Sequence, residues 1–380
     1  MSWPLVKFKD IANVVTGSTP KKNTEYFDGE VPFVTPGDLG VVSEVTTTAR
    51  TLTREGAATV RCIPAGSVMV CCIGATIGKV GYTNQKVASN QQINSLVVDT
   101  SKADPKYVYY YCLTLKPKLI SASSSTTMPI VNKSTFAEFE IPLPPLAEQK
   151  RIAAILDKAD AIRQKRKQAI DLADEFLRSV FLDMFGDPVS NPKGWETKRM
   201  GDVIEFKGGH QPPKSTFKYE PEQGYVRLIQ IRDFKTDKYK TYIPEDKARR
   251  IFDVDDVMIA RYGPPVFQIL KGLSGSYNVA LMKASPKNDS FLKSFIFYLL
   301  QLPAYHDVIV ANSERTAGQT GVNLELLNNF TVPVPSLSQQ QDIMAHMVRL
   351  ETIIDKFNVQ LTDAEELFSS LSQKAFSGEL

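Results

Sequence analysis

The chain has 380 residues, 43% of them hydrophobic, and its 45 Lys and Arg against 42 Asp and Glu give a net charge of +3. This composition is typical of a soluble globular protein of two or three domains and excludes a disordered chain. The longest apolar run, 295–302, is far shorter than the roughly 20 residues of a membrane span, and the amino terminus lacks the apolar core of a signal peptide. Four cysteines without a CxxC pair favour a reducing compartment, so we expect a cytoplasmic protein with no membrane partner.

Residues 1–145 alternate strand-like runs with turn signals and then give a helical run. The strand-like runs, such as VPFVTPGDL and INSLVVD, are rich in β-branched and aromatic residues and are bounded by Gly, Pro and Asp. A Ser/Thr-rich stretch at 121–132 follows, and Asn132 is predicted to cap a short helix because its side-chain oxygen accepts from an orphan N–H. This stretch is either a surface loop that leads into a cap or a loop that faces a substrate.

Residues 146–190 are predicted to form a long helix. Pro144 and Pro145 block a helix upstream and so fix its start. About 36 residues at roughly 1.5 Å each would make a rod on the order of 54 Å long. The predicted apolar face steps through Ile152, Ala159, Arg166, Ala173 and Val180, with Ile155, Ile162, Ala169 and Phe176 between them.

The second half of the chain repeats the first after a shift of about 191 residues. IPLPPLAEQKRI at 141–152 recurs as VPVPSLSQQQDI at 332–343, so residues 191–337 are predicted to form a second mixed α/β domain and 338–380 a second long helix. Asn323 is the second predicted cap, within the stretch 311–323. The other paired landmarks are Trp3 with Trp195, Asp10 with Asp202, Gly17 with Gly209, Asp38 with Asp233, and Gly74 with Gly263.

The second helix carries the clearer apolar pattern, and both helices have more apolar residues than a two-helix seam needs. Its face reads Ile343, Leu350, Phe357, Ala364 and Leu371, with Met347, Ile354, Leu361, Phe368 and Ala375 one turn away. Two such rods are predicted to pack antiparallel. The wide apolar stripe either binds a partner or packs on the chain's own domains. The residues assigned to a partner interface are Leu156, Ile170, Leu177, Phe181, Met184, Met347, Ile354 and Phe368.

No catalytic constellation and no metal site is predicted from the residues. GATIGKV at 74–80 has three residues between its glycines where a phosphate-binding loop needs four, and it reads as strand, turn and strand. The three histidines lack ligand spacing. Both globular segments are mildly basic, with 14 Lys and Arg against 11 Asp and Glu in 1–145 and 20 against 16 in 191–337, whereas 338–380 has 3 against 7. This division favours two polyanion-binding modules on a spacer.

Three segments carry a resemblance to a known family. WPLVKFKDIANVVTGSTPK near the start, PLPPLAEQKRI before the first long helix and SLSQKAFSGEL in the second copy together resemble the specificity subunit of type I restriction-modification systems. The resemblance covers essentially the whole chain. It implies two target-recognition domains, each reading one half of a split double-stranded DNA site, and helices that space them. It also implies two methyltransferase subunits and restriction/translocase subunits as partners. S-adenosylmethionine, ATP and Mg²⁺ are then expected on those partners, with no cofactor in this chain.

DNA reading needs cations for phosphates and side chains that reach base edges, with Arg suited to guanine and Asn or Gln to adenine. The rods would hold the half-sites about one helical turn apart. Two alternatives stay open, which are a self-sufficient DNA-modifying enzyme and a structural adaptor without DNA specificity. The predicted DNA-binding residues are Lys21, Lys22, Lys79, Ser124, Ser125, Thr126 and Thr127 in the first domain, and His210, Lys214, Arg232, Arg261, Tyr262, Arg315 and Gln319 in the second.

Overall fold

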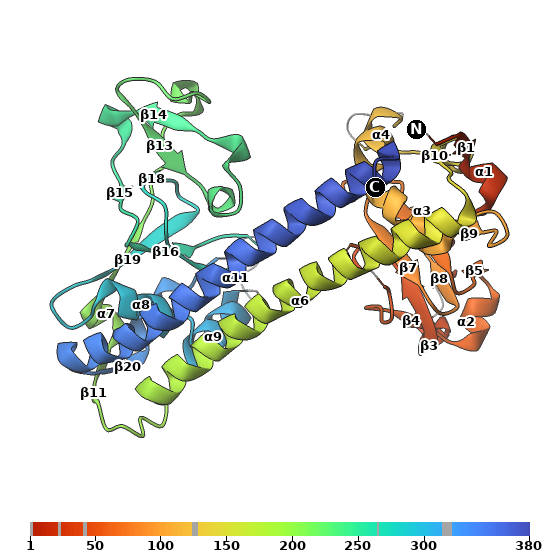
Figure 1. Ribbon diagram of the computed structural model, residues 1–380. Helices are drawn as coiled ribbons and strands as arrows, with labels where there is room; N and C mark the ends of the chain where they lie inside the picture. The colour runs from red at the N-terminus through yellow and green to blue at the C-terminus, as the bar shows by residue number, and fades with distance from the viewer. Residues whose placement is uncertain (1–2, 22–23, 41–43, 124–127, 264–265, 314–320) are drawn as a thin grey trace. The chain divides into compact units, whose positions relative to one another are not determined.

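The computed structural model describes residues 3–21, 24–40, 44–123, 128–263, 266–313 and 321–380, which fall into two compact units (Figure 1). The first unit comprises 1–169 together with 357–380, and the second comprises 170–356. Two long helices, α6 (Leu146–Phe185) and α11 (Leu337–Ser377), are each divided between the units. The predicted long helices are therefore present.

Three sheets form the first unit. An antiparallel sheet has the strand order β2-β9-β6-β7, a mixed sheet has the order β4-β3-β8-β5 with β3 and β8 parallel, and β1 pairs with β10. The elements before α6 are β1 (Leu5–Lys7), α1 (Phe8–Ile11), β2 (Ala12–Thr16), η1 (Thr24–Tyr26), β3 (Phe27–Val34), β4 (Thr51–Leu52), α2 (Arg54–Ala58), β5 (Cys62–Ile63), β6 (Ser67–Cys71), β7 (Val80–Thr83), β8 (Val87–Ser89), β9 (Ile93–Val98), α3 (Pro105–Leu113), α4 (Lys116–Ser121), α5 (Lys133–Ala137) and β10 (Glu140–Pro142).

The second unit repeats this topology strand for strand. Its orders are β12-β19-β16-β17, β14-β13-β18-β15 with β13 and β18 parallel, and β11-β20. The predicted pair of similar α/β domains is confirmed. The elements before α11 are β11 (Glu196–Arg199), α7 (Met200–Val203), β12 (Ile204–Gly208), η2 (Lys214–Thr216), β13 (Tyr225–Ile229), η3 (Ile231–Phe234), η4 (Asp237–Tyr239), β14 (Tyr242–Pro244), η5 (Glu245–Lys247), β15 (Ile251–Phe252), β16 (Val257–Ala260), β17 (Ile269–Leu270), β18 (Gly275–Tyr277), β19 (Leu281–Pro286), α8 (Lys293–Leu299), α9 (Pro303–Ser313), α10 (Leu324–Asn329) and β20 (Thr331–Val334).

Two repeated glycines lie where a side chain has no room. A Cβ on Gly17 would lie 2.1 Å from the backbone oxygen of Asn90, and one on Gly209 would lie 1.9 Å from that of Asn278. Both distances are far below van der Waals contact. Glycine at Gly17 lets the chain after β2 come close to the β8–β9 turn. Glycine at Gly209 does the same for the chain after β12 and the β18–β19 turn.

The repeated polar residues hold local backbone. Asn132 and Asn323 accept hydrogen bonds from the N–H groups of residues 135 and 326 at 2.8 and 3.0 Å, so both predicted helix caps are confirmed. Asp38 accepts from the N–H of Thr35 at 2.8 Å, and its counterpart Asp233 accepts from that of Gln230 at 2.7 Å. These four side chains shape turns.

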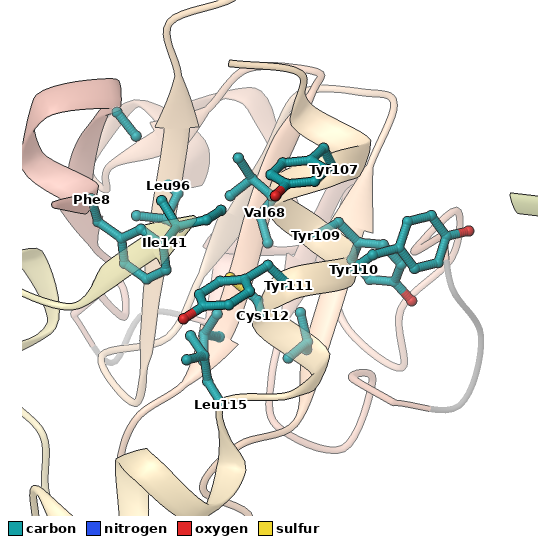
Figure 2. Packing of buried hydrophobic residues seen from close by; sticks show 14 of the residues in the cluster. Phe8, Val68, Leu96, Tyr107, Tyr109, Tyr110, Tyr111, Cys112, Leu115 and Ile141 are labelled. Carbon is teal, nitrogen blue, oxygen red and sulfur yellow. The ribbon is translucent and has the colours of Figure 1, made fainter. Parts of the chain in front are cut away.

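Helix α3 fills the core of the first unit (Figure 2). Tyr107, Tyr109, Tyr110 and Tyr111 are all buried, because one side of the helix packs on β6 and β7 and another faces the long helices. The hydroxyls of Tyr107 and Tyr111 each donate to a β10 carbonyl at 2.7 Å, and the hydroxyl of Tyr110 donates to Asp157 at 2.5 Å. These three buried tyrosines thus keep their polar ends paired.

A buried glutamine follows each proline-rich linker. Gln340 is fully buried; its side-chain oxygen accepts from Leu292 N–H at 2.9 Å, and its amide donates to the carbonyls of Ser290 (2.7 Å) and Pro335 (2.9 Å). Gln149 repeats this in the first unit, accepting from Asp104 N–H at 2.9 Å. Each glutamine fastens its linker to the start of α3 or α8.

Within each unit the two long helices run antiparallel and pack on the unit's own core. Ile152, Leu156 and Ala159 of α6 share the first core with Phe368 and Ala375 of α11. In the second unit, Figure 1 shows α8 beside α11 and α9 beside α6. The cluster there joins Leu177, Phe181 and Phe185 of α6 to Ile343, Met344 and Met347 of α11.

Part of the prediction for the helix faces was wrong. Five residues assigned to a partner interface are covered by this chain, because α3 and α8 pack where a partner was expected. In addition, Ile162 and Phe176, predicted on the packed face of α6, are 49% and 58% exposed. Ile170, Met184 and Ile354 are half-buried. The five covered residues are Leu156, Leu177, Phe181, Met347 and Phe368.

Two further predictions concern the membrane and the cysteines. Among the described residues no single helix has the length and hydropathy of a membrane span. The helices α8 and α9 have that length and hydropathy only when taken together, and the chain bends by 64° between them. Cys71, Cys72 and Cys112 are free and buried, and Cys62 is free and half-buried.

Candidate nucleic-acid interface

In the first unit, the ends of several strands bring three loops together. Backbone N–H groups of Gly17 and Ser18, after β2, donate to Ile93 (3.0 Å) and Ser89 (2.8 Å), which flank the β8–β9 turn. The N–H of Cys72, after β6, donates to the carbonyl of Gln92 at 2.8 Å in that same turn. The turn therefore lies between the other two loops.

The second unit builds the same arrangement. Gly209 and His210 donate through their backbone N–H groups to Leu281 (3.0 Å) and Tyr277 (3.1 Å), and the N–H of Arg261 donates to Ala280 at 2.8 Å. Because the backbone hydrogen bonds repeat while the side chains differ, the two units present different side chains on the same backbone arrangement. We call each set of loops the loop cluster of its unit, comprising residues 17–21, 72–79 and 90–92 in the first unit, and residues 209–214, 261–263, 266–268 and 278–280 in the second.

The Ser/Thr/Gly-rich stretches connect to these clusters through their described ends. Gly74 N–H donates to Pro129 and Val131 N–H to Cys72, each at 2.9 Å, and Val322 N–H donates to Arg261 at 3.1 Å. Isolated bridges join Ile73 to Ile130 and Tyr262 to Gly321. The following predicted DNA-binding residues lie outside the described residues and stay predictions: Lys22, Ser124, Ser125, Thr126, Thr127, Arg315 and Gln319.

Four of the other predicted residues lie in the second loop cluster. The half-buried His210 lies beside Gly209, and the Arg261 guanidinium lies 5.1 Å from the ring centre of Tyr262. The Nε of Arg261 is buried and has no hydrogen-bond partner among the described atoms. Lys214 is exposed at the start of η2. This cluster presents an ordered cation next to an aromatic ring.

The remaining predicted residues are placed differently. Lys21 is exposed in the loop after β2. The Lys79 ammonium donates to the carbonyl of Pro36 at 3.2 Å, and its stem covers Gly40, so this lysine is directed toward its own chain. Arg232 lies outside the cluster, in η3 of the β13–β14 connection.

The sequence prediction missed the amide side chains of the β8–β9 turn. Asn90 accepts from the N–H of Gln92 at 3.1 Å and donates to its side-chain oxygen at 3.0 Å, while the exposed Gln91 accepts from the Thr19 hydroxyl at 2.7 Å. Asn and Gln suit adenine edges, so three consecutive amides between two strands were the available signal. In the second unit Asn278 is the counterpart of Asn90.

Burial keeps the groups beneath the clusters neutral. It raises the pKa of the Cys72 thiol to about 12 and that of the Tyr277 hydroxyl to about 12. Among the described residues, no group of three or more His, Cys, Asp or Glu is placed to hold a metal ion. The arrangement offers cations, amides and an aromatic ring for hydrogen bonding and stacking.

Comparisons with known proteins agree with the repeat. The type I restriction modification DNA specificity domain matches residues 2–172 and again 192–363. The MjaIX specificity subunit of Methanocaldococcus jannaschii is 29% identical over 240 residues, 57% of this chain and 55% of that protein. The HindI specificity subunit of Haemophilus influenzae is 31% identical over 189 residues, 46% and 40% of the two chains. The chain thus spans about half the length of these curated relatives.

Solved structures share the fold. A chain from a structural study of type I R-M system assembly aligns with a TM-score of 0.54 and 18% identity, covering 100% of this chain and 98% of that one. The S subunit of a type I restriction-modification system from M. genitalium aligns with a TM-score of 0.53 and 15% identity, covering 99% and 96%. Since the family match extends over most of the chain in two copies, the chain belongs to the type I restriction modification DNA specificity family.

Proposed function

We propose that this chain gives a type I restriction-modification complex its DNA sequence specificity, with each unit reading one half of a split, asymmetric site. The observation that carries the proposal is the pair of loop clusters with the same backbone bonds and different side chains. A shared frame gives both units the same way of meeting DNA. Different side chains on that frame give each unit its own base preference.

In this proposal the second cluster reads a guanine-containing half-site. The Arg261 guanidinium can form the two parallel hydrogen bonds that guanine offers in the major groove, and the ring of Tyr262 limits its rotamers. In the first unit, Gln91 and Gln92 offer amides suited to adenine. Lys21 and Lys214 supply phosphate contacts, which orient the duplex without reading it.

The exposed apolar residues of α6 and α11 are the proposed docking surface for two methyltransferase subunits. They replace the buried residues assigned to this role from the sequence. The large ones on α6 are Ile162, Leu172, Phe176 and Leu182, and those on α11 are Leu337, Val348, Ile353, Val359 and Leu367. Chemistry is proposed to reside on partners, with S-adenosylmethionine on the methyltransferases and ATP with Mg²⁺ on a restriction/translocase subunit, in the cytoplasm.

The test is to co-express the chain with its neighbouring methyltransferase in a methylation-free host and map modified adenines by long-read sequencing. We expect a split motif with a fixed non-specific gap. Exchanging residues 1–145 for the same segment of a relative should replace one half of the motif and leave the other half and the gap unchanged. A continuous motif, or replacement of both halves together, would contradict the two-reader proposal. Methylation by the chain without its partner would show that it is itself an enzyme.

A further inference from the structure

The β13–β14 connection of the second unit, residues 230–241, carries an unusual concentration of positive charge. It contains four Lys or Arg against two Asp, whereas the corresponding β3–β4 connection, residues 35–50, contains one Arg against one Asp and one Glu. The two connections join equivalent strands of equivalent sheets. The excess of positive charge is therefore specific to the second unit and is not a property of the shared fold.

The two carboxylates of this connection are already engaged. Asp233 is buried, accepts from Gln230 N–H, and lies 3.8 Å from the Arg227 guanidinium. Asp237 pairs with Arg227 at 2.8 Å and with Lys240 at 3.1 Å. Within the part of the chain that the structure describes, Arg232, Lys235 and Lys238 have no carboxylate within ion-pair distance.

Two of these three cations are ordered by one exposed ring. The Arg232 guanidinium lies 5.5 Å and the Lys238 ammonium 5.4 Å from the ring centre of Tyr239, which is 52% exposed. Arg232 also donates to the Tyr239 carbonyl at 3.4 Å. A cation held over an aromatic face keeps its charge and has less rotamer freedom left to lose on binding. The ring of Tyr239 thus positions two positive charges where they can bind an anion.

These side chains surround an open hollow of about 610 Å³. Its wall carries two carboxylates, Asp237 and Glu220, and the exposed Tyr219 also lines it. The cations of the wall are Arg232, Lys238 and Lys240. The connection also begins at the second loop cluster, because Ile229 accepts from Asn278 N–H at 3.1 Å. A duplex seated on that cluster would bring its phosphates toward the same connection.

We infer that residues 230–241 form a phosphate-binding arm that contacts the DNA backbone beside the half-site read by the second unit, and that the first unit lacks a counterpart of equal charge. This inference rests on the proposed function. It assigns Arg232 and Lys238 to phosphates, where they add affinity without base preference. The two halves of the site then differ in how strongly salt weakens their binding.

The experiment uses the full chain in complex with its methyltransferase and a duplex that carries the mapped site. We would measure the binding constant from low to moderate salt for the wild type, for Arg232→Gln/Lys238→Gln and for Tyr239→Leu. Each lost phosphate contact lowers the slope of log K against log salt by about 0.9, so the double variant should lose about 1.8. Tyr239→Leu keeps both charges and should bind about threefold more weakly.

The control variant, Lys193→Gln/Lys198→Gln, removes the same charge from the second unit, at β11 and the turn before it, and should keep the wild-type slope. An equal loss in control and test variants would show a net-charge effect and overturn the arm. A changed methylation motif in the Arg232→Gln/Lys238→Gln variant would mean that these residues read bases, which also overturns it. If the wild-type complex binds no duplex, the proposed function itself fails, whereas a wild-type slope in the Arg232→Gln/Lys238→Gln variant refutes the arm alone.

Discussion

Replacing Gln340 with leucine tests whether the linker clamp holds the second unit together. Leucine has nearly the same volume but leaves one N–H (Leu292) and two carbonyls (Ser290, Pro335) without their partner. A typical net loss is about 1 kcal/mol for each such bond, so we expect the free energy of unfolding of the second unit to fall by about 3 kcal/mol. With a urea m-value of about 3 kcal/mol/M, the midpoint should move down by about 1 M.

The chain offers its own probe for each unit, because Trp3 lies in the first and Trp195 in the second, and the sequence has no other tryptophan. In a Trp3→Phe background, the emission of Trp195 reports the second unit, and Gln340→Leu should shift its urea transition. Gln341→Leu, at an exposed position one residue on, is the matched control and should change stability by less than about 0.5 kcal/mol. Equal shifts for the two variants would refute the clamp.

Three other changes give distinct outcomes. Phe181→Ala removes a fully buried ring and should lower the free energy of unfolding, measured by heat or urea, by about 3 to 5 kcal/mol. Phe176→Ala, at an exposed ring, should leave stability nearly unchanged and weaken capture of the methyltransferase in a pull-down. Gly209→Ala should disturb the second loop cluster and weaken DNA binding in a gel-shift titration, whereas Gly224→Ala, where the added Cβ meets nothing within 4 Å, should cost only about 1 kcal/mol of stability. Hydrogen bonds from Lys7 and Lys9 lower the pKa of Glu138 from 4.5 to about 2. Its stabilising effect is therefore present above pH 4.5 and lost as the pH falls toward 2. In Glu138→Gln the urea midpoint should change less with pH across that range.

The sequence was sufficient for the parts of the fold that repeat. Asn132 and Asn323 act as the predicted caps, because capping depends on local chain chemistry that recurs in both halves. The linker glutamines lie within the repeated string, but their role was not predicted, because Gln340 bonds to residues 48 and 50 positions away. The faces of α6 were less predictable. Seven-residue stepping placed Ile162 and Phe176 toward a second helix, but the domain helices α3 and α8 also cover α6 and select a different stripe.

The candidate site shows a similar limit. Arg261 and Tyr262 were predicted from their residue types, and the structure places them in a loop cluster with His210. Gln91 and Gln92 were missed because they follow a short buried strand and read as a turn. Only the pairing of that turn with the loop after β2, 72 residues away in sequence, shows that the Gln91 amide shares a surface with Thr19.

The division of α6 and α11 between the units has a consequence for synthesis. Residues 170–356 form the second unit without a break, so it can fold as soon as that segment has left the ribosome. The first unit, although it begins earlier in the chain, waits for residues 357–380, because Phe368 and Ala375 complete its core. Until they arrive, Leu156 and the tyrosines of α3 expose an apolar surface. The half that is translated first is therefore finished last, and during that interval its apolar surface is open to aggregation.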